Sequence, residues 1–256
     1  MAGKGAKTGM RKGRVRADAA VLARGLAPSR ERAQAFILAG TVFADGQRVE
    51  KPGQPVAEDS TLEVRGADHP WVSRGGIKLA HALDHFGIDP AGLICLDIGA
   101  STGGFTDVLI ERGATRVYAV DVGRGQLAWK LRQDSRVVVL EGTNVRHLSR
   151  ALVPDAPSLI TADVSFIGLE VALPAALALA APGARLVALI KPQFEVGKGK
   201  VGKGGIVREP ALHAEVCERI GTWLDEAGWQ VEGIIDSPIL GGEGNKEFLV
   251  AARKRL

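Results

Sequence analysis

Four charged residues stand beside apolar runs, where chemistry is a better explanation than solubility. Lys78 opens a predicted helix in SRGGIKL, and Asp163 ends a predicted strand in TADVSF. Lys191 ends another strand in ALIKPQFE, and Glu247 begins the last strand in NKEFLV. Each alone could be a solvated charge, but ligands bind at the strand ends of open α/β sheets. Two amines and two carboxylates at such an edge together indicate an active site that moves a proton.

A glycine-rich turn is the second chemical feature. In LICLDIGASTGGFTDVL a buried strand ends at Asp97, the turn runs from Gly99 to Gly104, and a helix begins. Glycines let a ligand approach the backbone and its unpaired N–H groups. The spacing D-x-G-x-x-x-G differs from the G-x-G-x-x-G of dinucleotide enzymes and resembles motif I of S-adenosylmethionine-dependent methyltransferases. Asp121, at the end of the next strand, is placed to accept both ribose hydroxyls.

The expected site for S-adenosylmethionine is built from the ends of neighbouring strands. After the third strand, the successive residues Glu141, Gly142, Thr143 and Asn144 are placed to line an adenine pocket. An unliganded α/β turn is the alternative interpretation. We predict no metal site, because His81 and His85 have no third ligand at a matching spacing. The residues expected to contact the cofactor are Asp97, Gly99, Ala100, Ser101, Thr102, Gly103, Phe105, Asp121, Val122, Asn144 and Asp163.

A glycine- and lysine-rich stretch, GKGKVGKG at 197–204, nearly matches a phosphate-binding P-loop. The position after Lys203 is Gly204 rather than the serine or threonine that binds Mg²⁺, and no helix is predicted there. We therefore reject a P-loop. The stretch is better explained as a mobile basic loop, in which Lys198, Lys200 and Lys203 reach RNA phosphates or close over the site.

From residue 91 onward the sequence alternates between apolar runs and helical periodicity. Strands are predicted at 93–98, 117–120, 137–140, 159–164, 186–190, 231–235 and 248–252, and helices at 103–112, 166–181 and 211–227. Apolar strands joined by helices form a mostly parallel sheet covered on both faces. The predicted fold class is therefore α/β, with a Rossmann-like, doubly wound methyltransferase sheet. The last two strands are expected to pair antiparallel as a hairpin.

The N-terminal quarter differs in composition and pattern. Residues 16–66 predict two helices, an Asp45-Gly46 hairpin and a further strand. This α+β pattern, with Arg24, Arg30 and Arg32 near the corner between the helices, resembles the S4-like RNA-binding domain. A small cap with surface arginines is the alternative. We predict a basic disordered tail at 1–15, the S4-like domain at 16–66, a linker at 67–76 and the methyltransferase domain at 77–256.

Charge and cysteine content favour a cytoplasmic RNA-binding protein. The formal net charge is +4, and the whole excess lies before residue 73. A basic segment suits a polyanion, because phosphate contacts release counterions. The chain has 2 cysteines, too few for a disulfide framework, and no apolar run approaches the ~18 residues of a membrane span. The expected RNA contacts are Arg14, Arg16, Arg24, Arg30, Arg32, Arg74, Lys198, Lys200 and Lys203.

Several motifs together resemble one family from about residue 16 onward. SRGGIKL, DIGASTGGFTDVL, DVSFI, KPQFEVGKGKVGKGGIV and GNKEFL are similar to the TlyA family, some of whose members are labelled hemolysins. The resemblance implies a ribosomal-RNA 2′-O-methyltransferase that joins an S4-like domain to an FtsJ-like domain and methylates a cytidine ribose in 23S rRNA. Whether 16S rRNA of the 30S subunit is a second target, besides 23S rRNA of the 50S subunit, stays open. The family's Lys-Asp-Lys-Glu set matches Lys78, Asp163, Lys191 and Glu247.

The chemistry fits this resemblance. A ribose 2′-hydroxyl must lose its proton as it attacks a sulfonium methyl, and only a neutral lysine amine can take that proton. We expect Lys191 to take or orient it, Lys78 to tune the local field, and Asp163 and Glu247 to position the lysines and the hydroxyl. Two other classes of function remain: a membrane-active hemolysin, and a non-catalytic rRNA-binding assembly factor.

Overall fold

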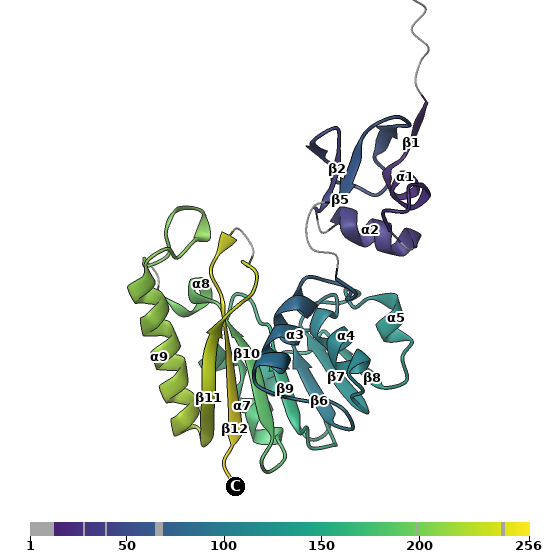
Figure 1. Ribbon diagram of the computed structural model, residues 1–256. Coiled ribbons are helices and arrows are strands. Elements are labelled where there is room, and N and C mark those ends of the chain that lie inside the picture. Colours follow the sequence, from purple (N-terminus) through teal and green to yellow (C-terminus); the bar gives the residue numbers. More distant parts are fainter. Residues whose placement is uncertain (1–12, 28, 39, 65–68, 198, 242–243) are drawn as a thin grey trace, which may run out of the picture. The chain divides into compact units, whose positions relative to one another are not determined.

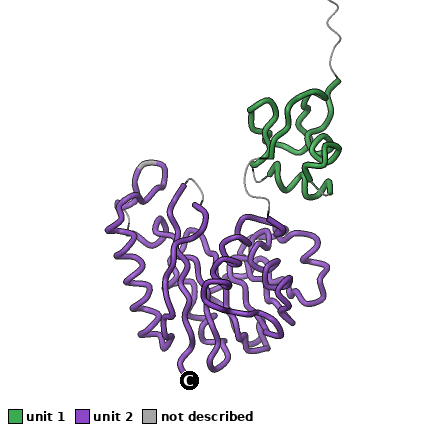
Figure 2. The backbone as a smooth tube through the Cα atoms, in the orientation of Figure 1, with its two compact units in different colours: residues 1–68 green, residues 69–256 purple. Residues whose placement is uncertain are grey.

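The computed structural model describes residues 13–27, 29–38, 40–64, 69–197, 199–241 and 244–256, apart from the side chain of Lys203. The chain divides into two compact units, Met1–Asp68 and His69–Leu256, which Figure 2 colours separately. The division falls inside the predicted linker 67–76, so the linker residues from His69 onward belong to the larger unit. Most of the predicted tail, and Lys198, lie outside the described residues.

The smaller unit is an α+β fold with two helices and two small sheets (Figure 1). Strand β1 pairs antiparallel with β4, and the second sheet has the order β3-β2-β5. Asp45 and Gly46 have φ values of 50° and 78°, as the predicted hairpin turn requires. Val21, Ile37 and Val42 are buried in its core. Its elements are β1 (Arg14–Arg16), α1 (Ala17–Ala23), α2 (Arg30–Leu38), β2 (Val42–Ala44), β3 (Gln47–Arg48), β4 (Pro55–Ala57) and β5 (Leu62–Val64).

The predicted disordered tail extends too far into this unit. Arg14 and Val15 lie in β1, opposite Ala57 and Val56. Antiparallel pairing with β4 orders these residues, and α1 follows β1 directly at Ala17. The sequence missed this strand because three residues are too few to show an alternating pattern.

The larger unit contains a seven-stranded sheet with the order β11-β12-β10-β9-β6-β7-β8. Strands β6 to β10 run parallel, and β12 lies antiparallel between β10 and β11. This order confirms the predicted doubly wound α/β fold and the antiparallel last pair. The strands are β6 (Ile94–Ile98), β7 (Arg116–Asp121), β8 (Val137–Glu141), β9 (Leu159–Ala162), β10 (Arg185–Ile190), β11 (Trp229–Asp236) and β12 (Phe248–Lys254).

Helices cover both faces of this sheet (Figure 1). Helices α3 (Gly75–His85), α4 (Gly104–Glu111) and α5 (Trp129–Arg132) contribute to one apolar layer. Helices α6 (Leu169–Ala172), α7 (Pro174–Leu179) and α9 (Pro210–Glu226) contribute to the other. The remaining short helices are η1 (Val145–His147), α8 (Pro192–Glu195) and η2 (Lys203–Gly205).

The single helix expected at 166–181 is wrong. Phe166 has a φ of 64°, which lies outside the right-handed helical region, so the helical stretch begins only at Leu169. Pro174 then starts a second helix, because proline has no N–H to continue the first. The sequence analysis recognised the helical, apolar character of this region but missed the break between α6 and α7.

The fold brings the carboxyl ends of five strands to one edge of the sheet. The parallel strands β6 to β10 all end there, and the antiparallel strand β12 begins there, since Ile190 at the end of β10 lies opposite Phe248. The chain order reverses between β6 and β9, the neighbours at the topological switch point where open α/β sheets bind ligands.

Candidate active site

The turn after β6 runs close to the end of β9. A Cβ at Gly99, which has a φ of 79°, would lie 2.4 Å from the carbonyl oxygen of Asp163. A Cβ at Gly103, with a φ of 98°, would lie 2.3 Å from the side chain of Leu131. Only glycine fits either position. Ala100 and Gly103 are buried, while Ser101 and Thr102 at the tip of the turn are exposed, as a ligand-contacting turn requires.

Asp97 does not face the ligand side of this turn. It is fully buried, and its carboxylate accepts hydrogen bonds from Thr106 Oγ1 at 2.6 Å and Thr161 Oγ1 at 3.0 Å. Burial away from any cation raises its pKa to about 6. Phe105 is also buried, in the apolar layer beneath the turn. In this structure both residues support the turn from below, and their expected contacts with the cofactor stay a prediction.

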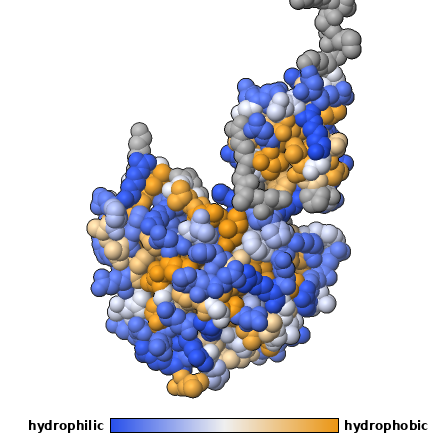
Figure 3. All heavy atoms as spheres, in the orientation of Figure 1, coloured by the Kyte–Doolittle hydropathy of each residue, from blue (hydrophilic) through white to orange (hydrophobic). Residues whose placement is uncertain are grey.

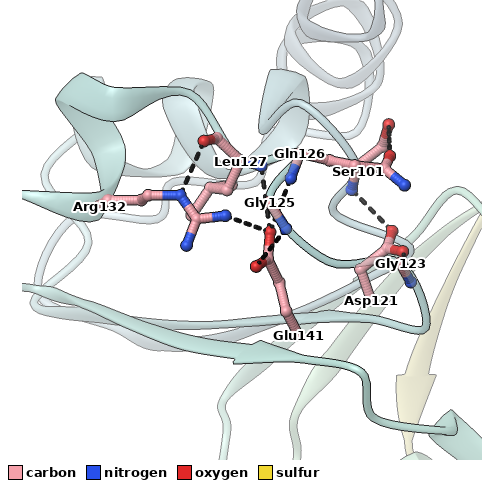
Figure 4. Close-up of polar contacts among 8 residues, drawn as sticks. All are labelled: Ser101, Asp121, Gly123, Gly125, Gln126, Leu127, Arg132 and Glu141. Carbon is pink, nitrogen blue, oxygen red and sulfur yellow. Dashed lines mark hydrogen bonds and ion pairs between the residues drawn. The ribbon is translucent and has the colours of Figure 1, made fainter.

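Asp121, at the end of β7, holds the tip of the turn (Figure 4). Its Oδ2 accepts a hydrogen bond from Ser101 N at 2.8 Å, and its Oδ1 accepts one from Gly123 N at 2.7 Å. Each oxygen keeps a further lone pair, so the carboxylate can still accept hydroxyl groups. The neighbouring Val122 is strongly exposed and offers an apolar surface beside it.

Glu141 organises the next loop, a role that the sequence analysis missed. Its carboxylate accepts hydrogen bonds from three successive backbone amides, those of Gly125, Gln126 and Leu127, and also pairs with Arg132 (Figure 4). The bond from Arg132, followed by these amides, lowers the pKa of Glu141 to about 2. A charged residue at the end of β8 was the only available signal.

Asn144 lies beyond Glu141 on the same strand-end loop. Its Oδ1 accepts a hydrogen bond from Arg146 N at 3.1 Å and so caps the short helix η1. The Asn144 side chain is half-buried and does not belong to the hydrophobic core. It keeps its amide nitrogen available at the position expected to line an adenine pocket.

The four charged residues form two ion pairs. Lys78 Nζ lies 2.5 Å from Glu247 Oε2, and Lys191 Nζ lies 2.5 Å from Asp163 Oδ1. The Glu247 side chain is 2% exposed, whereas that of Asp163 is 24% exposed. The pair of Asp163 and Lys191 is therefore the more open one, just beyond the ends of the neighbouring strands β9 and β10.

Ser165 extends the open pair. Its Oγ accepts a hydrogen bond from Lys191 Nζ at 3.0 Å, a contact that the sequence analysis did not predict. Phe166, the next residue, is 89% exposed and contacts the ring of Phe194, with 4.9 Å between centroids. Lys191 Nζ is 6.0 Å from the centroid of Phe194. The open pair thus adjoins an exposed aromatic surface.

Helix α3 carries Lys78 and is fitted closely against α4. A Cβ at Gly104 would lie 2.2 Å from Ser73 Oγ, and one at Gly76 would lie 2.6 Å from the Trp71 side chain. Val72 N also donates to Asp107 Oδ2 at 2.8 Å. The stretch before Lys78 is therefore packed onto α4, the helix that begins at the glycine turn, and it fixes where α3 starts.

The segment before β12 determines the position of the Glu247 side chain. A Cβ at Gly241 would lie 1.9 Å from Glu247 Oε1, so only glycine leaves room for this carboxylate. Two residues before it, Asn245 accepts a hydrogen bond from Val207 N at 3.1 Å and donates one to Gly205 O at 3.0 Å. The end of the basic loop is thereby fastened to the strand that carries Glu247.

The expected RNA-binding residues of the smaller unit are held differently. Arg14 is exposed, and Arg32 lies 4.7 Å from the ring centroid of Phe36. Arg24 donates to the carbonyl oxygens of Glu58 and Ser60, which gives its guanidinium a structural role. The two remaining arginines of this set are Arg16 and Arg30, and both pair with Asp18.

The expected RNA-binding residues of the larger unit lie on its surface where they are described. Arg74 is exposed at the start of α3, and Lys200 makes an exposed ion pair with Glu215 at 2.9 Å. Lys198 lies outside the described residues, as does the side chain of Lys203.

Neither a membrane span nor a metal cluster occurs among the residues that the structure describes. None of their helices is long and apolar enough to cross a bilayer, and Figure 3 shows hydrophilic residues interspersed with separate hydrophobic patches on the visible face. The same residues contain no group of three or more His, Cys, Asp or Glu side chains placed to hold a metal ion.

Comparison with known proteins agrees with this geometry. A family described as FtsJ-like methyltransferase matches residues 71–254, and the S4 domain matches residues 15–62. The chain is 48% identical to the 16S/23S rRNA (cytidine-2′-O)-methyltransferase TlyA of Mycobacterium tuberculosis, over 94% of this chain and 90% of that protein. It is 41% identical to Hemolysin A of Brachyspira hyodysenteriae, over 92% of this chain and 98% of that protein.

Solved structures show the same similarity. A structure described as a hemolysin from Streptococcus thermophilus is 43% identical, with a TM-score of 0.75 over 94% of this chain and 89% of that chain. A structure described as an S-adenosylmethionine-dependent methyltransferase from Listeria monocytogenes is 15% identical, with a TM-score of 0.53 over 72% of this chain and 100% of that chain. The second likeness concerns the fold alone.

Proposed function

The chain belongs to the FtsJ-like methyltransferase family, and we propose that it transfers a methyl group from S-adenosylmethionine to a ribose 2′-hydroxyl of ribosomal RNA. The family and the S4 domain are those expected from the sequence. The observation that carries the proposal is the pair of lysine–carboxylate contacts at one sheet edge, beside the glycine turn. Relatives named as rRNA (cytidine-2′-O)-methyltransferases support the choice of substrate.

The strand-end residues fit S-adenosylmethionine. Gly99 and Gly103 leave the turn free of side chains where the cofactor's amino-acid end would approach the backbone. Asp121 would accept the ribose hydroxyls, and Val122 with Asn144 would border the adenine. Cofactor chemistry supplies an activated methyl group. Binding and orientation fall to these residues, with Asp97 and Phe105 supporting them from the interior.

Proton handling would fall to the open pair. Lys191 is held between Asp163 and Ser165, which limits the directions in which its amine can point. As the 2′-oxygen bonds to the methyl carbon, the methyl–sulfur bond would break and leave a neutral thioether. The hydroxyl proton would leave toward Lys191, which takes it as a neutral amine or orients it. Asp163 would position both the amine and the hydroxyl. Lys78, held by Glu247 in the buried pair, would add positive potential that steadies the developing charge on the 2′-oxygen.

The substrate we propose is a cytidine ribose in 23S rRNA of the 50S subunit, with 16S rRNA of the 30S subunit as a second target to be tested. The S4 unit would dock structured RNA through phosphate and shape. The target nucleotide would turn outward, so that its base contacts exposed Phe166 while its hydroxyl faces Lys191. Because its substrate would be found with the ribosomal subunits, the location we propose for the protein is the cytoplasm.

One experiment tests this function against its two competitors. Purified protein is incubated with radiolabelled S-adenosylmethionine and unmodified 50S or 30S subunits, and methyl transfer to RNA is counted. We expect transfer to 50S subunits. Binding to subunits without transfer would support the assembly factor instead. Leakage of dye from liposomes, without transfer, would support membrane lysis, the activity that the hemolysin names of relatives suggest.

A further inference from the structure

The smaller unit contains a buried carboxylate that the proposed chemistry does not use. Asp18, in the first turn of α1, is completely buried. Its Oδ1 accepts hydrogen bonds from Arg16 Nε at 3.0 Å and from Ala19 N at 2.9 Å. Its Oδ2 accepts from Arg16 Nη2 at 2.9 Å, Arg30 Nε at 3.2 Å and Gln34 Nε2 at 3.0 Å. Five donors therefore surround a carboxylate that no solvent reaches.

This carboxylate brings two arginines together. Arg16, at the end of β1, and Arg30, at the start of α2, touch the same oxygen. Without a shared anion, two guanidinium groups this close would repel each other. Hydrogen bonds from Arg16, followed by those from Gln34 and Arg30, hold the pKa of Asp18 well below its usual range. Asp18 therefore stays ionised under all conditions in which RNA is handled.

The outer sides of both arginines remain available. Their side chains are 53% and 50% exposed, although the carboxylate beneath them is buried. In the part of the chain that the structure describes, Nη1 of Arg16 and both Nη atoms of Arg30 have no hydrogen-bond partner. Arg16 also lies against Gly53, where a Cβ would be 2.9 Å from Nη1. Asp18 thus uses one edge of each guanidinium, and the other N–H groups of these half-exposed side chains have no partner among the described residues.

We propose that Asp18 is a positioning residue, which presents Arg16 and Arg30 as a preformed two-point receptor for phosphates of the RNA backbone. One buried negative charge against two arginines leaves a net positive charge at the surface. Guanidinium groups bind phosphate through paired N–H donors, and a fixed side chain loses less conformational entropy on binding. This inference rests on the proposed function, since it takes structured rRNA as the ligand.

Two explanations of Asp18 predict opposite effects of removing its charge. If the arginines attract RNA only by charge, Asp18→Asn adds one unit of positive charge to the unit and tightens binding. If Asp18 positions them, the same change releases both side chains and weakens binding in spite of the gained charge. We expect about tenfold weaker binding to 50S subunits, which corresponds to the loss of roughly one charge-assisted hydrogen bond.

The test measures affinity for unmodified 50S subunits across a range of salt concentrations. Glu50→Gln is the matched control, because it removes the same charge from an exposed residue of the same unit. We expect this control to bind as tightly as the original protein or more tightly. In Asp18→Asn we expect a salt slope smaller by about 1, as lost phosphate contacts require. In methyl transfer, KM for subunits should rise while kcat stays unchanged.

A second pair of variants covers the case in which Asp18→Asn fails to fold. Arg16→Lys and Arg30→Lys keep the charge but lose the paired N–H groups, and each should weaken binding severalfold. Unchanged affinity in both lysine variants, or tighter binding by folded Asp18→Asn, would overturn the inference. Methyl transfer by the original protein is scored separately. Failure of the proposed function can therefore be distinguished from failure of the inference about Asp18.

Discussion

The two lysine–carboxylate pairs of the larger unit have the same N–O distance but different surroundings. Both distances are 2.5 Å, and the two lysine side chains are 10% and 11% exposed. The difference lies in the carboxylates, since Glu247 is 2% exposed and Asp163 is 24% exposed. A reacting group can approach the pair of Lys191 and Asp163 directly. The pair of Lys78 and Glu247 can act on it only through space or through neighbouring atoms.

The largest effect is expected at the open pair. Lys191→Met removes the amine that takes or orients the proton, while a methionine of similar length preserves packing. We expect methyl transfer to fall by at least ~1000-fold, within the range of lost general-base catalysis. Binding of S-adenosylmethionine, measured by calorimetry, should stay within about twofold. Near-normal turnover in this variant would show that the open pair is not the reacting one.

The buried pair is expected to affect stability as well as activity. Lys78→Met leaves Glu247 buried without a cation, which should lower the free energy of unfolding by about 3–5 kcal/mol. Adding Glu247→Gln removes the stranded charge and should recover most of that loss in urea unfolding. Transfer should remain low in the double variant, because the positive potential is still missing. Methyl transfer at the original rate in the double variant would show that Lys78 has only a structural role.

A third carboxylate sharpens the comparison, because Asp97 is buried with hydroxyl groups and no cation. Its folded-state pKa of about 6 lies above the unfolded value of 3.8, so its ionisation opposes folding as pH rises. Relative to Asp97→Asn, the original protein should lose about 2 kcal/mol of unfolding free energy between pH 4 and pH 7. Parallel stability curves for the two proteins would contradict this assignment.

The smallest expected effect concerns Ser165. Ser165→Ala removes one hydrogen bond to Lys191 and leaves its ion pair with Asp163 in place. The cost should be about 1 kcal/mol, a roughly fivefold lower kcat with little change in thermal stability. Ser149→Ala, a change at an exposed serine outside the open pair, serves as the control and should leave kcat unaffected. A drop comparable to that of Lys191→Met would mean that Ser165 itself handles the proton.

The sequence predicted most of the sheet because buried parallel strands are recognisable as short apolar runs. It also placed Lys191 and Asp163 at one edge, since residues that end parallel strands must meet there. The antiparallel last strand followed from the hairpin-like spacing before Phe248. These predictions depend only on the order of the strands along the chain, and that order can be read from local sequence patterns.

The directions in which individual side chains point could not be predicted from the sequence as well as the strands could. Asp97 and Phe105 belong to the glycine-turn motif, yet both point inward, because their partners Thr106, Thr161 and the apolar layer come from other elements. The hydrogen bonds by which Glu141 organises the preceding loop were missed for the same reason. Its four donors lie 9 to 16 residues away in sequence, a relationship that no local pattern displays.

The most direct test of the account is the chemical position of the transferred methyl group. Methylated 50S RNA is digested to nucleosides and analysed by mass spectrometry, with Lys191→Met as the inactive control. The account predicts 2′-O-methylcytidine from the original protein and none from the control. A methyl group on a base, or equal ribose methylation by both proteins, would contradict the assignment of Lys191 and Asp163 as the reacting pair.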